Sequence, residues 1–474
     1  MKISKFILIL LLGIYCLPFP VHAQTISLDE FFTQLQQTHP YFEKERMNAR
    51  IEQEKQTGLL GNEDWNVFSS VSLSQENPAI AFSGPERISS VNFSGGISRL
   101  YWKTGGRLTT SFSTGSAFIK LPPGAIGFPE SFQQHQINVE YTHPLKKNKS
   151  GFLDQLEYRS KEYNIDFSEI QALENMENFL ETAAVKFLDW VFFIEQEKIV
   201  RNRLTLSEEE LDNVQKRREA YVADEVDVIR ARDAVRLWTQ NLVLVESYIK
   251  SIQAELATLL QNDELNTTTP EYNIYETVEL RPLEETLAGI KENARVIRVL
   301  STSIDQQWFY RQGFEEHLKP DISIVSKLNL KRAEDKVMES FLLNKPDISV
   351  GLQYNFPREN RTTQSNIHQT DLQIERLEKE IDSITLTLSS TVTNLHILLL
   401  ELENVLVLNQ EQIQSAEEKT TEELALYNQG RSNLTFVIQS RDSEQNARFT
   451  YAQNALTYHK LILQYRSLLD QLLQ

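Results

Sequence analysis

The sequence predicts an α+β fold in which very long helices follow short groups of strands. Two patterns carry this prediction. Apolar residues recur every three or four positions over long stretches without proline, which is typical of helices. Elsewhere apolar and polar residues alternate with a period of two, which is typical of half-buried strands. Both patterns occur twice in the same order along the 474 residues.

The first 23 residues have the pattern of a signal peptide. A basic start, MKISK, precedes the apolar stretch FILILLLGIYCL, and VHA before Gln24 predicts cleavage near Ala23. The alternative is that the segment stays in place as an anchor. The only cysteine, Cys16, lies within it, so the mature chain would contain none. Disulfides and cysteine metal sites are therefore excluded.

Composition excludes several classes of function. A formal net charge of -18 argues against a nucleic-acid partner, because phosphate binding needs a basic surface. The eight histidines are scattered, and no catalytic or nucleotide-binding motif is present. We therefore expect no enzyme activity, cofactor or metal. After the signal peptide no run of about 18 apolar residues follows, so a membrane segment would have to consist of strands.

The first half begins with helices and continues with strands. Residues 27–60 are predicted to be helical, with Ser27 and Glu30 forming a capping box and Pro40 separating two helices. Alternation begins at residue 66 and continues through SVNFSGGISRLYW, TGGRLTTSFSTG and HQINVEYTHPL. Proline and glycine predict a loop over 121–132. Residues 151–262 are again helical, with a stretch of about 65 residues that would reach roughly 100 Å and would need neighbouring helices along its length.

The second half repeats this order. Residues 282–318 are predicted to be helical, DISIVSKLNL and DISVGLQYNFP to be strands, and 365–425 to be a second very long helix. A short polar joint around Gly430 separates it from a last helix. FVIQSRD at 436–442 matches DVIRARD at 227–233, an offset of 209 positions. We interpret this as an internal duplication with repeats at 24–280 and 281–474, each a helix, two strands and a long helical hairpin.

The sequence resembles the TolC-like outer-membrane efflux protein family over essentially the whole mature chain. YNQGRSNLTFVIQSRD and the residues after it are similar to the family's second helical joint. SLDEFFTQLQQTHPYFEKERMNARIEQE is similar to the family's opening, with His39-Pro40 in place of Asn-Pro. YTHPLKKNKSG at 141–151 and NFPREN at 355–360 resemble the turns that lead from strands into long helices.

The resemblance implies an outer-membrane duct of a tripartite efflux or type I secretion system. The chain would form a homotrimer with a coiled-coil helical barrel in the periplasm and a transmembrane β-barrel in outer-membrane lipid. Each chain would supply four strands. Four strands cannot close a barrel alone, whereas three copies would remove every open edge. A periplasmic adaptor and an inner-membrane pump would dock on the helices, and substrate would leave passively.

The resemblance also places the two helical joints, at 218–227 and 427–436, at the periplasmic tip. There they would bind the adaptor and form the gate. Gly430 favours the positive φ that ends a helix, whereas the aligned position of the first joint holds Tyr221. We expect a link from Tyr427 and Arg431 to Asp224 or Asp227. The alternative is that these are solvated tip charges, each pair contributing less than about 1 kcal/mol.

Four positions of the family pattern are altered in the second joint. The expected arginine is displaced by one place to Arg431, and Ser432 occupies its usual position. Phe436 and Gln439 stand where the family has acidic residues, so an acidic ring is not reproduced. A hydrophobic constriction at Phe436 is a second possibility for the gate.

Two other classes of protein remain possible. A periplasmic adaptor is also built on long coiled-coil hairpins, but it has one central hairpin instead of two. A purely structural coiled-coil protein would leave the alternating strands unexplained.

Overall fold

The computed structural model describes residues 25–78, 85–122, 129–334, 343 and 346–473, which form two compact units. Unit 1 takes its described residues from Met1–Lys44, Leu173–Ile290 and Thr387–Gln474, and unit 2 consists of Glu45–Ala172 and Lys291–Leu386. Both units therefore draw on both halves of the chain. The expected signal peptide and Cys16 lie outside the described residues.

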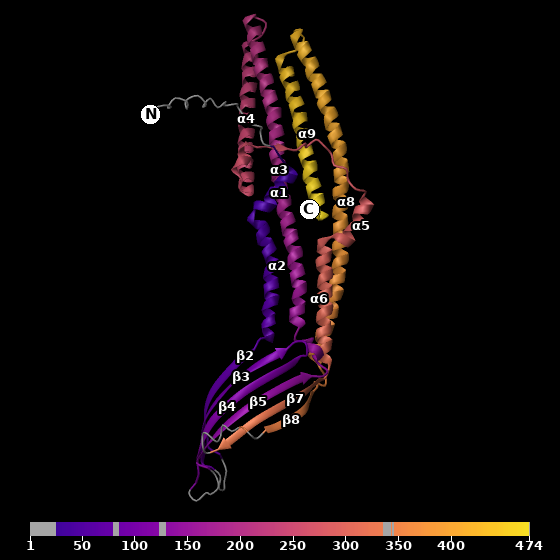
Figure 1. Ribbon diagram of the computed structural model, residues 1–474. Helices are drawn as coiled ribbons and strands as arrows, with labels where there is room; N and C mark the ends of the chain where they lie inside the picture. Colours follow the sequence, from indigo (N-terminus) through magenta and orange to yellow (C-terminus); the bar gives the residue numbers. More distant parts are fainter. Residues whose placement is uncertain (1–24, 79–84, 123–128, 335–342, 344–345, 474) are drawn as a thin grey trace, which may run out of the picture. The chain divides into compact units, whose positions relative to one another are not determined.

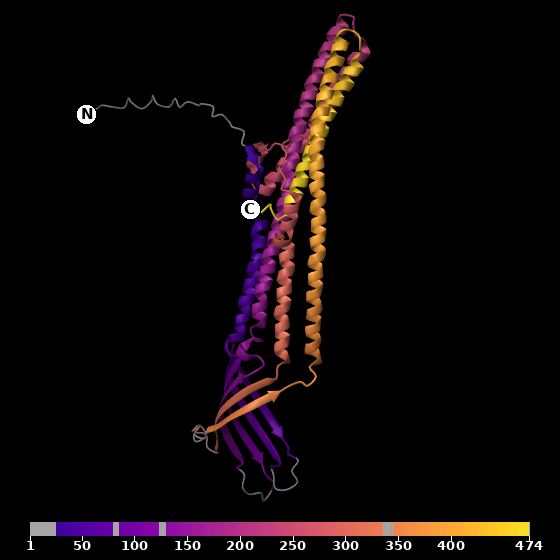
Figure 2. The ribbon, with the colours of Figure 1, turned by 90° about the vertical axis from the view of Figure 1, so that its right-hand side faces the viewer.

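Unit 1 consists mainly of helices, which run side by side in Figures 1 and 2. It contains α1 (Leu28–Thr38), the later part of α3 (Leu156–Glu219), α4 (Glu225–Leu260), the later part of α8 (Arg361–Asn428) and α9 (Leu434–Leu468). Their interior is aromatic: Phe187 lies with its ring centroid 5.3 Å from Phe31 and 5.8 Å from Trp190. These helices need one another, because no single helix of this length buries its own apolar stripe.

The predicted capping box and the predicted helix boundary at Pro40 are both confirmed. Ser27 caps α1 by accepting a hydrogen bond from the Glu30 amide at 3.2 Å, and the Glu30 side chain accepts from the Ser27 amide at 3.0 Å. The helix ends at Thr38, and α2 (Pro40–Leu59) begins at the proline. Proline suits the first turn of a helix because its missing amide hydrogen would have no partner there.

A short parallel strand pair in unit 1 was not predicted. β1 (Thr25–Ser27) pairs with β6 (Thr269–Glu271), which follows α4 and the short η3 (Asp263–Thr267). Strands of three residues carry too little alternation to be read from sequence. The chain then continues to α5 (Leu283–Asn293), which starts in this unit.

Unit 2 contains one antiparallel sheet, and its strand count corrects the expectation of four strands per chain. The described residues form six strands in the order β2-β3-β4-β5-β7-β8 (Figure 1). They are β2 (Asn66–Glu76), β3 (Arg87–Tyr101), β4 (Gly106–Lys120), β5 (Ser131–Pro144), β7 (Asp321–Glu334) and β8 (Pro346–Asn355). The first half of the chain therefore supplies four strands and the second half two.

The register gives the sheet one apolar and one polar face. Residues directly opposite in an antiparallel sheet share a face, so the pairing defines rows across all six strands. One row is Val67, Ile97, Thr110, Val139, Leu328 and Ile348. The neighbouring row, on the other face, is Asn66, Ser98, Thr109, Glu140, Lys327 and Ser349.

Side chains on the polar face bond to one another along the sheet. The hydroxyls of Ser70 and Ser94 are 2.7 Å apart, and the Gln136 amide donates to Asn329 Oδ1 at 2.9 Å. The Lys327 ammonium lies 3.0 Å from the Glu140 carboxylate. The apolar face has large side chains in the corresponding positions, so the two faces suit different surroundings.

Helices leave this sheet at two turns, as the sequence predicts. After β5, Asn148 adopts φ 61° and its side-chain oxygen accepts from the Leu153 amide at 2.9 Å, just before α3. After β8, Asn360 has φ 44° next to the start of α8 at Arg361. Asparagine tolerates this left-handed conformation better than most residues.

The helices of unit 2 are joined by polar contacts. They are most of α2, the start of α3, α6 (Arg295–Leu318) and the start of α8, with η1 (Leu60–Glu63) and η2 (Lys149–Gly151) at their ends. Arg311 on α6 bonds to Asp371 on α8 at 2.6 Å, and Gln306 donates to Asn164 at 3.0 Å. The predicted single helix over 282–318 is interrupted at Ala294, which caps α6 with extended backbone.

One helix, α8, contains a stretch that is long and apolar enough to cross a membrane by length and composition alone. Only 28% of that stretch is buried in the single chain. The charges within HILLLELENVLVL interrupt its apolar residues, so the sequence does not predict this stretch. Exposed apolar residues in this region of α8 are Ile397, Leu398, Leu400, Val407 and Leu408.

Candidate functional site

The two hairpin turns of unit 1, at 220–224 and 429–433, are the predicted functional region. Both views show them at the same end of this unit (Figures 1 and 2). The first turn ends α3 with two hydrogen bonds. The Val222 amide donates to the Arg217 carbonyl at 2.8 Å, and the Tyr221 amide donates to Arg218 at 2.9 Å. With Tyr221 at φ 61°, this is a Schellman motif.

The second turn ends α8 in the same way. The Arg431 amide donates to the Leu426 carbonyl at 2.9 Å, and the Gly430 amide donates to Tyr427 at 3.0 Å. Gly430 has φ 73°, and a Cβ built there would meet no atom within 4 Å. Glycine is therefore present for its backbone freedom and not for lack of space.

The helices after the turns also begin alike. Asp224 and Asn433 precede α4 and α9 with extended backbone, at ψ 156° and 161°. Only Asn433 caps through its side chain, which accepts from the Phe436 amide at 3.3 Å. Asp224 makes no such bond in the described structure, although its carbonyl accepts from the Asp227 amide at 3.1 Å.

A group of apolar side chains, here called the tip cluster, fastens the two hairpins together just behind these turns. The tip cluster consists of Val214, Val228, Ala231, Tyr427, Leu434 and Val437. It contains residues from all four helices, and three of its members are fully buried. Burial of such side chains contributes about 1.5–3 kcal/mol each, so the two turns are held in one packed unit.

Arg217 and Tyr427 connect the hairpins on the polar side of the tip cluster. The Arg217 guanidinium carbon lies 4.2 Å from the centroid of the Tyr427 ring, close enough for a cation–π interaction. The guanidinium also donates to the Tyr427 carbonyl at 3.4 Å. Burial raises the pKa of the Tyr427 hydroxyl, which has no hydrogen-bond partner among the described residues.

The predicted acidic residues of the first turn lie at its surface. Asp227 pairs with Arg230 on the same helix at 3.2 Å, and Asp224 is exposed. Neighbouring Arg218 and Glu225 form a further pair across the turn at 2.5 Å. Within the described chain, then, Asp227 makes no hydrogen bond or ion pair to the second turn, although its negative charge adds to the burial that raises the pKa of Tyr427.

Two predicted residues of the second turn, Arg431 and Ser432, have different surroundings. Ser432 donates to the Glu423 carboxylate at 3.0 Å, which ties the turn back to α8. Arg431 is exposed and makes no ion pair within the described part of the chain. The structure thus brings Tyr427 into the tip cluster and leaves Arg431 free to reach a residue of another molecule.

Exposed side chains cover the outer surface of the two turns. Tyr221 is 97% exposed, Val222 65% and Phe436 50%. Gln439 is also exposed, one turn of helix after Phe436. An aromatic residue in left-handed backbone with almost its whole surface in solvent gains nothing from packing in the single chain, so packing does not offset the backbone strain there.

A buried ionic group, which sequence reasoning missed, joins α3 to α9 farther along the hairpins. Arg203 is fully buried and donates to the Asp442 carboxylate from Nη2 at 2.9 Å and from Nε at 3.1 Å. Glu210 lies 3.6 Å from Arg203 and 2.9 Å from Arg441. Burial raises the pKa of Glu210, and the two arginines oppose that shift.

These buried charges hold the hairpins in register. Removing one partner of a buried ionic group leaves the other charge without compensation and costs about 3–5 kcal/mol. The sequence signal was weak: Arg441 and Asp442 are part of FVIQSRD, but their partners lie more than 230 positions earlier. Only the packing of α3 against α9 brings them together.

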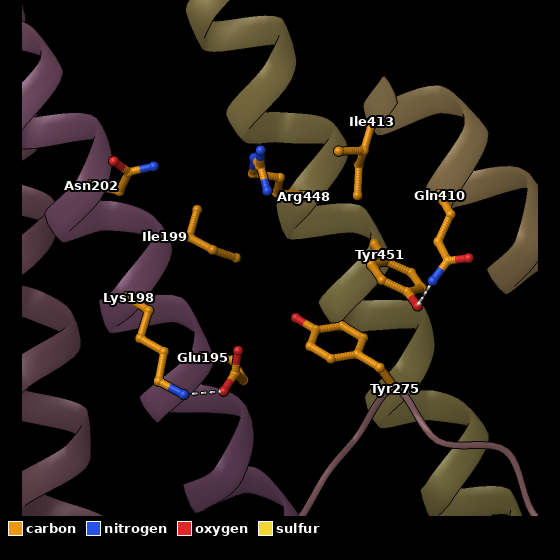
Figure 3. Close-up of a pocket in the computed structure, with 9 residues that line it drawn as sticks. All are labelled: Glu195, Lys198, Ile199, Asn202, Tyr275, Gln410, Ile413, Arg448 and Tyr451. Carbon is orange, nitrogen blue, oxygen red and sulfur yellow. Dashed lines mark hydrogen bonds and ion pairs between the residues drawn. The ribbon is translucent and has the colours of Figure 1, made fainter. Parts of the chain in front are cut away.

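An open cavity of about 470 Å³ lies between α3, α8, α9 and the chain after β6 (Figure 3). The rings of Tyr275 and Tyr451 stack at 4.6 Å, and Gln410 donates to the Tyr451 hydroxyl at 2.9 Å. Charged side chains around it are already paired: Lys198 with Glu195 at 2.6 Å, and Arg448 with Glu444 at 3.3 Å. This pairing leaves no free charge to select a ligand.

The described residues contain no group of three or more histidine or acidic side chains placed to hold a metal ion. The titratable groups at the tip are salt-bridged, exposed or buried by packing. Nothing in their geometry resembles a nucleophile beside a base.

Comparison with solved structures decides the fold. The chain is similar to the outer membrane protein VceC from Vibrio cholerae, with a TM-score of 0.65 and 9% identity over 94% of this chain and 96% of that one. It is similar to the outer-membrane channel OprN, with a TM-score of 0.66 and 12% identity over 94% and 90%. The chain has the fold of outer-membrane channels.

A third match supports the same fold. The Campylobacter jejuni CmeC outer membrane channel gives a TM-score of 0.63 at 11% identity, covering 94% of this chain and 85% of that one. No protein-family model and no characterised protein matches the amino-acid sequence significantly. The resemblance to the TolC-like family is thus confirmed for the fold, which this sequence retains at very low identity.

Proposed function

We propose that the chain is the outer-membrane duct of a tripartite efflux or type I secretion system. It would export substrate passively, from an inner-membrane pump across the periplasm and outer membrane, without chemistry of its own. The observation that carries the proposal is the channel fold over 94% of the chain, at TM-scores of 0.63–0.66. The sheet supports it, because a face of apolar rows backed by a face of polar rows suits lipid on one side and water on the other.

The duct would be a homotrimer. Open sheet edges are not tolerated in lipid, so the sheet needs partners. Exposed apolar residues on two helices also support a trimer. In the single chain α4 exposes Leu237, Val243 and Leu244, and α8 exposes the apolar residues named above. Contact with neighbouring copies would cover both. Coverage of α8 in this way also accounts for its apolar stretch without a membrane-spanning helix.

The two repeats, 24–280 and 281–474, would have arisen by duplication. The turns support this, since Tyr221 and Gly430 hold the same position in the same motif and are 209 residues apart, the offset of the matching heptapeptides. The signal peptide would direct export and be cleaved near Ala23. The helices would then lie in the periplasm.

The turns at the tip would bind a periplasmic adaptor and narrow to a gate. Tyr221, Val222 and Phe436 offer exposed apolar surface for the adaptor. Exposed Arg431 would link to Asp224 or Asp227 of a neighbouring copy. Tyr427 would act indirectly, by holding Arg217 and the tip cluster in place, while Gly430, Ser432 and Gln439 shape the surface around it.

Density fractionation of cell envelopes tests the proposal. We expect the protein in the outer-membrane fraction, as trimers that a lysine crosslinker captures. A soluble periplasmic monomer would contradict the proposal and would favour the alternatives of an adaptor or a structural coiled-coil protein.

A further inference from the structure

The six-stranded sheet has two unpaired edges, β2 and β8, within the described residues. Every residue of β2 and of β8 is exposed, whereas the four strands between them are largely half-buried. The backbone donors and acceptors along these edges therefore have no protein partner in one chain. In lipid, each unpaired group costs several kcal/mol.

The sheet cannot close upon itself. Transmembrane barrels begin at about eight strands, and the described chain supplies six. A partner must therefore supply a strand at each edge. Since each neighbouring pair in the sheet is antiparallel, β2 and β8 run in opposite directions. A β8 edge from a second copy placed against β2 continues the antiparallel pattern without a break.

The two faces also continue across such a seam. The apolar row ends on Val67 in β2 and on Ile348 in β8, and the polar row ends on Asn66 and Ser349. Copies joined edge to edge would keep the apolar rows on one side and the polar rows on the other. Strands of 11 and 10 residues are also long enough to cross the hydrocarbon layer when tilted.

We propose that three copies close an eighteen-stranded barrel through β2–β8 seams, in place of the twelve strands that the family resemblance implies. This inference rests on the trimeric duct proposed above. Barrel diameter grows with strand number, and barrels of about 16–18 strands enclose an aqueous channel. The bore is lined by the serine, threonine and asparagine face, so it passes hydrated polar solutes. Size selection then falls to the helical tip and not to the outer-membrane segment.

Cysteine crosslinking across the seam tests the strand number. The mature chain has no native cysteine, so every disulfide that forms must join two introduced cysteines. The polar-face pair S70C/S349C probes the β2–β8 seam, and S70C/G351C and S70C/Q353C scan its register. Opposite residues in neighbouring antiparallel strands have Cα atoms about 4.5–5.5 Å apart, which lies within the range that a disulfide spans. The control pair S113C/S349C probes a β4–β8 seam, the one that four strands per chain would form.

The expected result is reducible covalent trimers in outer membranes from at least one β2–β8 pair, and none from S113C/S349C or from single-cysteine variants. Trimers from S113C/S349C alone would overturn the eighteen-stranded barrel. So would lysine-crosslinked trimers in which no β2–β8 pair joins chains; in both cases the proposed duct would stand. Absence of trimers and of outer-membrane location would overturn the duct itself and this inference with it.

Discussion

Tyr221 and Gly430 hold the same position in two equivalent helix-ending motifs, with φ values of 61° and 73°. Glycine adopts this conformation freely, whereas a side chain there costs about 1–2 kcal/mol. The chain therefore bears strain at one turn and avoids it at the other. Because Tyr221 is 97% exposed, packing within the chain does not compensate for that strain.

Tyr221→Gly should stabilise the first turn by about 0.5–1 kcal/mol, since it removes the Cβ from left-handed backbone and loses no buried contact. Hydrogen–deuterium exchange of residues 216–226 should slow. Gly430→Ala is the matched control and should have the opposite effect at 425–435. If Tyr221 contacts the adaptor, Tyr221→Gly will also reduce transport in cells while the trimer becomes more stable. Faster exchange in Tyr221→Gly would contradict this view of the turn.

Tyr427→Ala should destabilise the tip by on the order of 3 kcal/mol, because it removes a buried ring from the tip cluster and the surface on which Arg217 rests. Tyr427→Phe keeps the ring, and the lost hydroxyl has no partner in the described chain. We therefore expect Tyr427→Phe to raise the unfolding midpoint slightly, because it removes a buried hydroxyl without a partner, and to leave the channel conductance unchanged. A rise in conductance for Tyr427→Phe would show that the hydroxyl itself takes part in the gate.

Asp227→Ala should raise conductance in planar bilayers if a link between copies holds the tip closed. Asp233→Ala is a suitable control, since Asp233 pairs with Arg236 three positions later on the same helix, as Asp227 does with Arg230. If only the loss of a surface ion pair mattered, conductance would change equally little in both variants. Equal conductance of Asp227→Ala and the unaltered protein would remove Asp227 from the gate.

His459 should make stability depend on pH. Burial lowers its pKa to about 4, and its ring lies 2.8 Å from the Tyr272 hydroxyl and 3.0 Å from the Ile274 carbonyl. The folded state thus favours the neutral ring. This contribution is fully present above the ordinary pKa of about 6.5 and is lost as pH falls toward 4, on the order of 3 kcal/mol in total.

The measurement for His459 is the unfolding midpoint of the purified protein between pH 7.5 and pH 4. His459→Gln should reduce the loss of stability on acidification, even if it lowers stability at neutral pH. An identical pH profile in both proteins would rule out His459 as the responsible group.

Helix caps and helix lengths in this fold could be predicted from the sequence, because they depend on residues that are close together along the chain. Ser27 and Glu30 predict the cap that the structure shows, and the spacing of apolar residues predicts both long helices to within a few residues. The strand number was wrong for a different reason. The expectation of four strands comes from the family resemblance, whereas the alternation through 106–120 and 131–144 by itself indicates the strands that the structure shows there.

The site was only partly predictable. Gly430 marks its turn through the backbone freedom of glycine. The contact of Arg217 with Tyr427, and that of Arg203 with Asp442, depend on how one helix is rotated against another more than 200 residues away. Spacing along a helix shows which residues share a face, but it does not show which residue of a distant helix meets them.

Thiol labelling of the sheet tests the central claim most directly. Asn138 and Val139 are neighbours on β5, with Asn138 on the polar face and Val139 on the apolar face. In outer membranes, a water-soluble maleimide should react readily with Asn138→Cys and hardly at all with Val139→Cys, because water fills the bore and lipid covers the other face. Equal reaction of both variants would contradict a membrane channel built on this sheet.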